Sequence, residues 1–74
     1  MKYKTRILVP TICIIIEDTS DGNCDANYDA AVFIGAARAE LEKERHIGDV
    51  MGVRQKNYNK YIIEFEYFGD KEAV

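Results

Sequence analysis

Oxygen-bearing side chains occupy every second position from residue 21 to residue 29, which is the spacing of a calcium-binding loop. They are Asp21, Asn23, Asp25, Asn27 and Asp29. Such a loop also needs a glycine at its sixth position and a bidentate glutamate at its twelfth. Ala26 and Val32 stand at those two positions instead. We therefore predict no metal ion and no other cofactor, and we interpret the segment as a polar loop that caps a following helix.

The cysteines and the single histidine are the other residues that could support catalysis. A cysteine nucleophile needs a base within hydrogen-bond reach. Cys24 precedes the expected helix, whereas His46 lies at the far end of that helix, about 27 Å away. Cys13 lies in an apolar segment and is predicted to be a small core residue. Since the sequence also contains no phosphate-binding loop or hydrolase motif, it predicts that the protein is not an enzyme.

Acidic residues gather between positions 17 and 29, where no basic residue occurs. They are Glu17, Asp18, Asp21, Asp25 and Asp29. Opposite charges steer two proteins together and speed their association. We therefore expect this acidic loop to be a protein-binding site. The alternative interpretation is that its charges only keep the protein soluble.

Basic residues form two groups, one near the start of the chain and one around residues 54–61. The first group is Lys2, Lys4 and Arg6, and the second is Arg54, Lys56 and Lys60 with Tyr58 and Tyr61 interleaved. Basic side chains beside aromatic rings suit single-stranded nucleic acid, which needs backbone contacts and stacking. The alternative interpretation is a solvated sheet edge. The net charge of −3 does not favour a nucleic-acid binder.

The hydrophobic pattern predicts the elements that position these residues. Residues 3–17 are rich in β-branched side chains and predict one long strand, with Pro10 at an edge or a bulge. Residues 30–45 predict a helix that ends at Arg45 and His46, with Gly48 as the residue that stops it. Its apolar stripe is Ala30, Phe33, Ile34, Ala37 and Leu41.

A hairpin is predicted to follow the helix. Its strands are residues 50–56 and 60–68, joined by a turn at residues 57–59, where asparagine tolerates left-handed backbone. Every neighbouring pair is antiparallel if strand 60–68 lies in the middle of the sheet. We therefore predict a single α+β domain over residues 1–74, with the order β-α-β-β. One helix would cover one face of a three-stranded antiparallel sheet.

The segment from Ile12 to Ile16 is apolar on both faces of the expected strand. Ile12, Ile14 and Ile16 point to one face, and Cys13 and Ile15 point to the other. One helix covers one face, so the N-terminal half of the strand, a loop or another chain must cover the second face. We predict a homodimer whose interface contains Ile12, Ile14 and Ile16, with Ile14 near its centre. The alternative is a monomer that uses this face to dock on a larger target.

The apolar run at residues 7–16 follows basic residues, as it would in a secretory signal. Acidic residues follow it, however, instead of a small-residue cleavage site. The run is also short of the roughly 20 residues that a membrane-spanning helix needs. We therefore expect a cytoplasmic protein with reduced cysteines.

Four segments together give the chain a strand–helix–hairpin layout: KYKTRILV, DANYDAAVFIGAARAEL, GDVMGV and YIIEFEYF. This layout resembles small phage-encoded proteins, including several anti-CRISPR inhibitors. The resemblance implies stoichiometric blocking of a bacterial defence complex without catalysis. We therefore expect a non-catalytic protein-interaction module that binds a host protein complex such as a CRISPR effector. The alternative is a small nucleic-acid-binding module that uses the basic hairpin.

Overall fold

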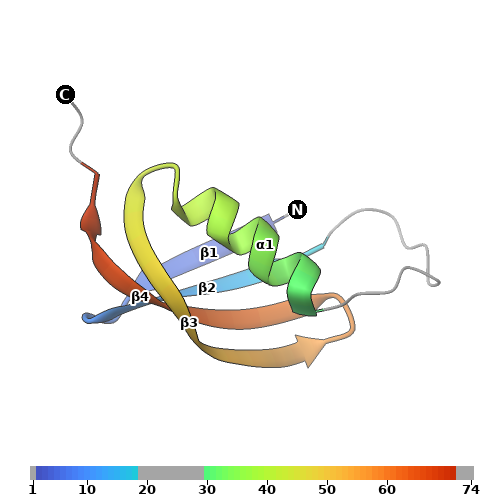
Figure 1. Cartoon of the computed structure of the whole chain (residues 1–74). Helices are drawn as coiled ribbons and strands as arrows, with labels where there is room; N and C mark the ends of the chain where they lie inside the picture. Colours follow the sequence, from blue (N-terminus) through green and yellow to red (C-terminus); the bar gives the residue numbers. More distant parts are fainter. Residues whose placement is uncertain (1, 19–29, 72–74) are drawn as a thin grey trace.

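A computed structural model describes residues 2–18 and 30–71 of the chain. Four strands form one sheet in the order β1-β2-β4-β3, and every neighbouring pair is antiparallel. The helix α1 lies across one face of this sheet (Figure 1). The elements are β1 (Lys2–Ile7), β2 (Thr11–Glu17), α1 (Ala30–Leu41), β3 (Arg45–Asn57) and β4 (Lys60–Asp70). The predicted α+β class, antiparallel sheet and single helix are confirmed, and β4 takes the central place considered for residues 60–68.

The prediction of three strands is wrong, because the chain reverses at Pro10. The Leu8 N–H donates to the Thr11 carbonyl at 2.8 Å, and the Val9–Pro10 peptide bond is cis. Proline has a fixed φ and no N–H, so it suits a turn better than the middle of a paired strand. The first half of the expected strand therefore becomes β1, which lies beside β2 as an edge strand instead of folding over a face of the sheet.

The helix is shorter than predicted. It ends at Leu41, whose side chain is buried in the core, and residues 42–44 form a turn. Arg45, His46 and Gly48 belong to β3, so their assignment to the end of the helix is wrong. Pairing with β4 replaces the helical hydrogen bonds here. Arg45 is in register with Asp70, and the Lys71 N–H donates to the Glu44 carbonyl at 2.8 Å.

Gly48 is needed for close packing within the hairpin and not for stopping the helix. A β-carbon at this position would lie 2.7 Å from Glu66 Oε1 and 2.8 Å from Phe68 Cε2. The register of β3 against β4 shifts on both sides of residue 48. The absence of a side chain therefore lets the irregular part of β3 approach β4 closely.

The core lies between α1 and one face of the sheet. The residues buried there are Ile12, Ile14, Ile16, Phe33, Ala37, Leu41, Tyr61, Ile63 and Phe65. The Phe33 and Tyr61 rings are 4.7 Å apart between centroids and tilted by 37°. The predicted helical stripe is confirmed, since Phe33, Ala37 and Leu41 are buried and its other members are packed against the core.

Candidate interaction surface

The face of the sheet opposite α1 has no described element covering it, and we call it the open face. Side chains directly opposite in an antiparallel pair lie on the same face of a sheet. The register therefore gives its members, which are Lys2, Lys4 and Arg6 of β1, Cys13, Ile15 and Glu17 of β2, Lys60, Ile62 and Glu64 of β4, and Arg54 of β3. Three of the four strands thus contribute several side chains to this surface.

The predicted interface residues do not belong to the open face. Ile12, Ile14 and Ile16 lie beneath α1 with at most 1% of their surface exposed. Side chains of β2 alternate between the two faces of the sheet. The helix therefore covers these three, whereas Cys13 and Ile15 point to the open face. The prediction that Ile12, Ile14 and Ile16 form a subunit interface is therefore wrong. The prediction of Cys13 as a core residue is wrong too, because it is only half-buried on the open face.

The centre of the open face is apolar. Ile15 of β2 and Ile62 of β4 are directly paired, and Ile15 keeps 36% of its surface exposed. Lys4 and Arg54 stand at the two ends of the same cross-strand row. Across the sheet, the row therefore consists of Lys4, Ile15, Ile62 and Arg54. The accessible apolar pair lies between two cations.

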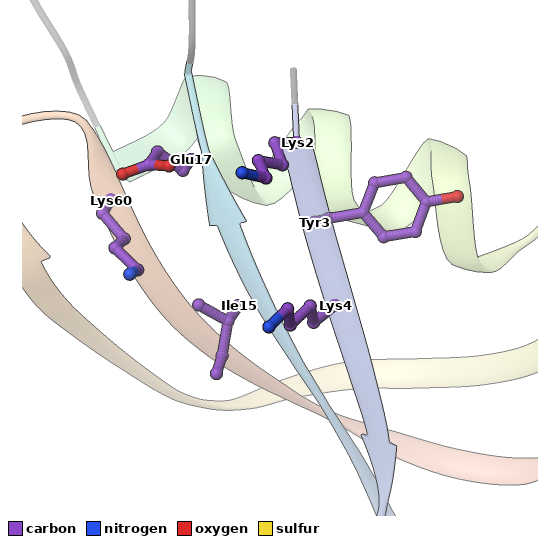
Figure 2. A pocket seen from close by; sticks show the side chains of 6 residues that line it. All are labelled: Lys2, Tyr3, Lys4, Ile15, Glu17 and Lys60. Carbon is purple, nitrogen blue, oxygen red and sulfur yellow. The ribbon is translucent and has the colours of Figure 1, made fainter.

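A shallow hollow of about 220 Å³ lies at one end of this face. Its lining residues are Lys2, Tyr3, Lys4, Ile15, Glu17 and Lys60. Figure 2 shows Lys2 and Lys4 extending from β1 towards Ile15 and Glu17, whereas Tyr3 points away from them. Glu17 is in register with Lys2 on one side and with Lys60 on the other. Three lysines and one glutamate therefore line the hollow, which leaves an excess of positive charge.

A second hollow, of about 300 Å³, continues the open face beyond Ile62. Its lining residues are Leu8, Cys13, Gly52, Val53, Arg54, Ile62 and Glu64. Burial raises the pKa of the Cys13 thiol, and the nearby Glu64 carboxylate raises it further, while Arg6 acts in the opposite direction. The Thr11 hydroxyl donates to Glu64. Cys13 therefore holds its proton more firmly than an ordinary thiol, which does not suit a nucleophile.

The basic hairpin only partly forms the predicted nucleic-acid site. Arg54 and Lys60 lie on the open face, Lys56 is exposed on β3, and Tyr58 is 64% exposed in the turn. Tyr61 is 5% exposed beneath α1. Successive residues of a strand face opposite ways, so Lys60 and Tyr61 cannot present a base and an aromatic ring to one ligand.

Only the beginning of the predicted acidic loop is described. Glu17 faces the hollow, and Asp18 adjoins the β3–β4 turn, where its N–H donates to the Asn59 carbonyl at 2.9 Å. The Asn59 side-chain amide donates back to the Asp18 carbonyl at 2.8 Å. Asp21, Asp25 and Asp29, the calcium-like spacing and Cys24 lie outside the described residues.

Within residues 2–18 and 30–71, no three His, Cys, Asp or Glu side chains gather as a metal site would require. His46 is exposed on β3, opposite Gly69. No helix in this part of the chain is long and apolar enough to cross a membrane.

Comparisons of the chain with family models, with curated proteins and with solved structures find no match. The surface therefore has to be interpreted from its own residues. The sequence groups Lys2, Lys4 and Arg6 but indicates no role for them, because the pattern predicts one long strand that begins with them. A turn at Pro10 is the signal that would place these three residues on one face of an edge strand.

Proposed function

We propose that this protein is a non-catalytic protein-interaction module that binds its partner through the open face. The observation that carries the proposal is the accessible Ile15–Ile62 pair at the centre of a charged sheet face. Protein interfaces commonly combine an apolar centre with a polar rim that sets orientation. A partner that covers this centre gains roughly 25 cal/mol for each Å² of apolar surface removed from water.

A more specific proposal is that the partner is a bacterial defence complex such as a CRISPR effector, and that the protein acts in the cytoplasm as a stoichiometric inhibitor. The support for it is the resemblance of the layout to phage-encoded inhibitors. Inhibition of this kind needs only a surface that occupies a site on the target, and the open face is such a surface. It needs no catalytic group on the inhibitor.

Nucleic-acid binding is the second candidate, and the observation in its favour is that Arg54 and Lys60 share the open face with Lys2 and Lys4. Two observations weigh against it. Glu17 stands among the lysines and would repel a phosphate, and Tyr61 is buried beneath α1. The open face therefore lacks the stacking platform that single-stranded binding uses.

Affinity capture from a nuclease-treated bacterial lysate tests the proposal when three forms of the protein are compared. We expect the wild type to retain a protein partner, Ile15→Glu to lose it, and Val32→Glu to keep it. Val32 is a matched control because it is 57% exposed on α1, on the other side of the molecule. Equal capture by all three forms would contradict binding through the open face.

An interference assay tests the more specific proposal. In a bacterium whose CRISPR system blocks a phage, expression of the wild type should restore plaque formation, and expression of Ile15→Glu should not. If the wild type fails to restore plaques although capture depends on Ile15, the partner is not a CRISPR effector and the general module remains.

A further inference from the structure

We propose that the outer edge of β1, together with the lysine-lined hollow, binds an extended acidic segment of the partner as an additional strand. The segment would carry Asp or Glu at every second position. This inference rests on the proposed function, since it names the chemistry of the partner that the open face takes.

The basic side chains of β1 have the spacing of a strand. Lys2, Lys4 and Arg6 alternate with Tyr3 and Thr5, and all of these residues are exposed. Alternate residues of a strand lie about 6.6–6.8 Å apart on the same face. A neighbouring strand with acidic residues at every second position therefore matches the three cations one to one. A helix or a compact acidic loop would not match them in this way.

The backbone of β1 has a free side. The strand pairs with β2 on one side, and in the described part of the chain no strand pairs with the other side. Antiparallel hydrogen bonds alternate along a strand, and the Leu8 N–H is bonded to the Thr11 carbonyl. The alternation directs the backbone N–H groups of Tyr3, Thr5 and Ile7 outward. Carbonyl oxygens of an added strand would accept hydrogen bonds from these groups.

The hollow adds residues of β2 and β4 to the surface that an acidic strand on β1 would face. Lys60 of β4 faces the same space as Lys2 and Lys4, and Ile15 lines its floor (Figure 2). Because neighbouring strands lie about 4.8 Å apart, a long side chain of the added strand that extends over β1 would reach Ile15 on β2, whereas Lys60 on β4 would act through its charge at longer range. This end of the open face therefore combines hydrogen bonds, charge and apolar surface for one extended ligand.

A second copy of the chain does not fit the same edge. Antiparallel pairing of β1 with β1 of another copy would set Lys2, Lys4 and Arg6 against the same three residues, and like charges directly opposite are destabilising. Basic residues on an exposed edge are a known protection against such pairing. The charge on this edge therefore favours an acidic partner over a homodimer.

Fluorescence anisotropy of short labelled peptides tests the inference. One peptide carries glutamate at every second position with valine between, and the other has the same composition with its glutamates grouped at one end. We expect the alternating peptide to bind at least about fivefold more tightly. High salt should weaken its binding, because the pairs are exposed to solvent.

Charge reversal on the protein supplies the matched control. Lys2→Glu/Lys4→Glu should weaken the alternating peptide more than about tenfold, since one exposed pair changes affinity roughly two- to fivefold and reversal adds repulsion. Lys56→Glu/Lys71→Glu makes the same charge change at two exposed lysines that are not members of the open face, and should weaken it less than threefold. Circular dichroism of each variant checks that it is folded.

Four results would overturn the inference. They are equal binding of the two peptides, no binding of either, equal loss in both double variants, and tighter binding of a single-stranded oligonucleotide than of the alternating peptide. Partner capture separates this inference from the proposed function. If capture is lost in Ile15→Glu but kept in Lys2→Glu/Lys4→Glu, the partner binds through the open face but does not add an acidic strand to β1. If capture is kept in Ile15→Glu while the alternating peptide still binds, the proposed function is contradicted and only the peptide site is supported.

Discussion

The Tyr3 side chain of the edge strand β1 lies close enough to the Glu40 carboxylate of the helix α1 for each to shift the pKa of the other. Hydrogen bonding with Glu40 raises the pKa of Tyr3, and the negative charge of Glu40 adds to the effect. The pKa of Glu40 is lowered by its hydrogen bonds, first with Lys43 and then with Tyr3. The contact therefore holds Tyr3 protonated and Glu40 ionised.

These two pKa shifts predict how the contribution of the contact depends on pH. The stabilisation from Glu40 is present above the ordinary pKa of a glutamate and is lost as the pH falls through the lowered value. The stabilisation from Tyr3 is present below the ordinary pKa of a tyrosine and is lost as the pH rises through the raised value. Thermal melts should show Tyr3→Phe less stable than the wild type near neutral pH. The difference should shrink at both extremes, and a constant difference would contradict the contact.

The two neighbours Ile14 and Ile15 should respond in opposite ways to the same substitution. Ile14 is fully buried, so Ile14→Glu places an unpaired charge in the core and should cost about 4 kcal/mol or more, which is enough to unfold a domain of this size. Ile15 lies on the open face, so Ile15→Glu should cost under about 1 kcal/mol. Urea melts measure both changes. Similar costs would show that the two faces of β2 are wrongly assigned.

The contact between Phe33 and Tyr61 predicts a large effect of truncation in the helix. Phe33 is fully buried with its ring against Tyr61. Phe33→Ala should therefore cost roughly 3–5 kcal/mol. Val32→Ala, which removes methyl groups from the exposed neighbour, should cost under about 0.5 kcal/mol. Equal costs in a urea titration would contradict the orientation of α1.

The surroundings of Cys13 predict slow alkylation. The raised pKa leaves less thiolate at pH 8 than an unperturbed thiol would have, so iodoacetamide should react more slowly with the folded protein than with the unfolded chain. Glu64→Gln should speed the reaction, and Arg6→Gln should slow it. A Cys24→Ser background restricts the measurement to Cys13. If Glu64→Gln left the rate unchanged, the carboxylate would not be acting on the thiol.

Local patterns in the sequence were enough to predict much of the fold. Phe33, Ala37 and Leu41 have helical spacing, and Tyr61, Ile63 and Phe65 alternate along a strand, so both core faces followed from periodicity. The turn at Pro10 is not evident from the sequence, because β-branched residues on both sides of it are typical of one continuous strand. Gly48 has the position of a helix stop in the sequence, whereas its role in the fold depends on Phe68, which is distant in the sequence.

The candidate surface was harder to predict than the core. Ile12 to Ile16 is apolar at every position, so the pattern indicates that one helix leaves a face of this strand uncovered, but it does not distinguish the two faces, and the choice of Ile12, Ile14 and Ile16 is wrong. Which face stays uncovered depends on where α1 packs, which is a tertiary contact. The role of Lys2, Lys4 and Arg6 depends in the same way on the pairing of β1 with β2.

The central claim is that a partner binds at the β1 side of the open face, and amide hydrogen exchange followed by NMR tests it most directly. With the alternating acidic peptide bound, the outward amides of Tyr3, Thr5 and Ile7 should exchange more slowly, and the resonances of Ile15 and Lys60 should shift. The amide of Val32 on the exposed side of α1 should be unaffected. Unchanged exchange in β1, or protection centred on α1, would contradict the claim.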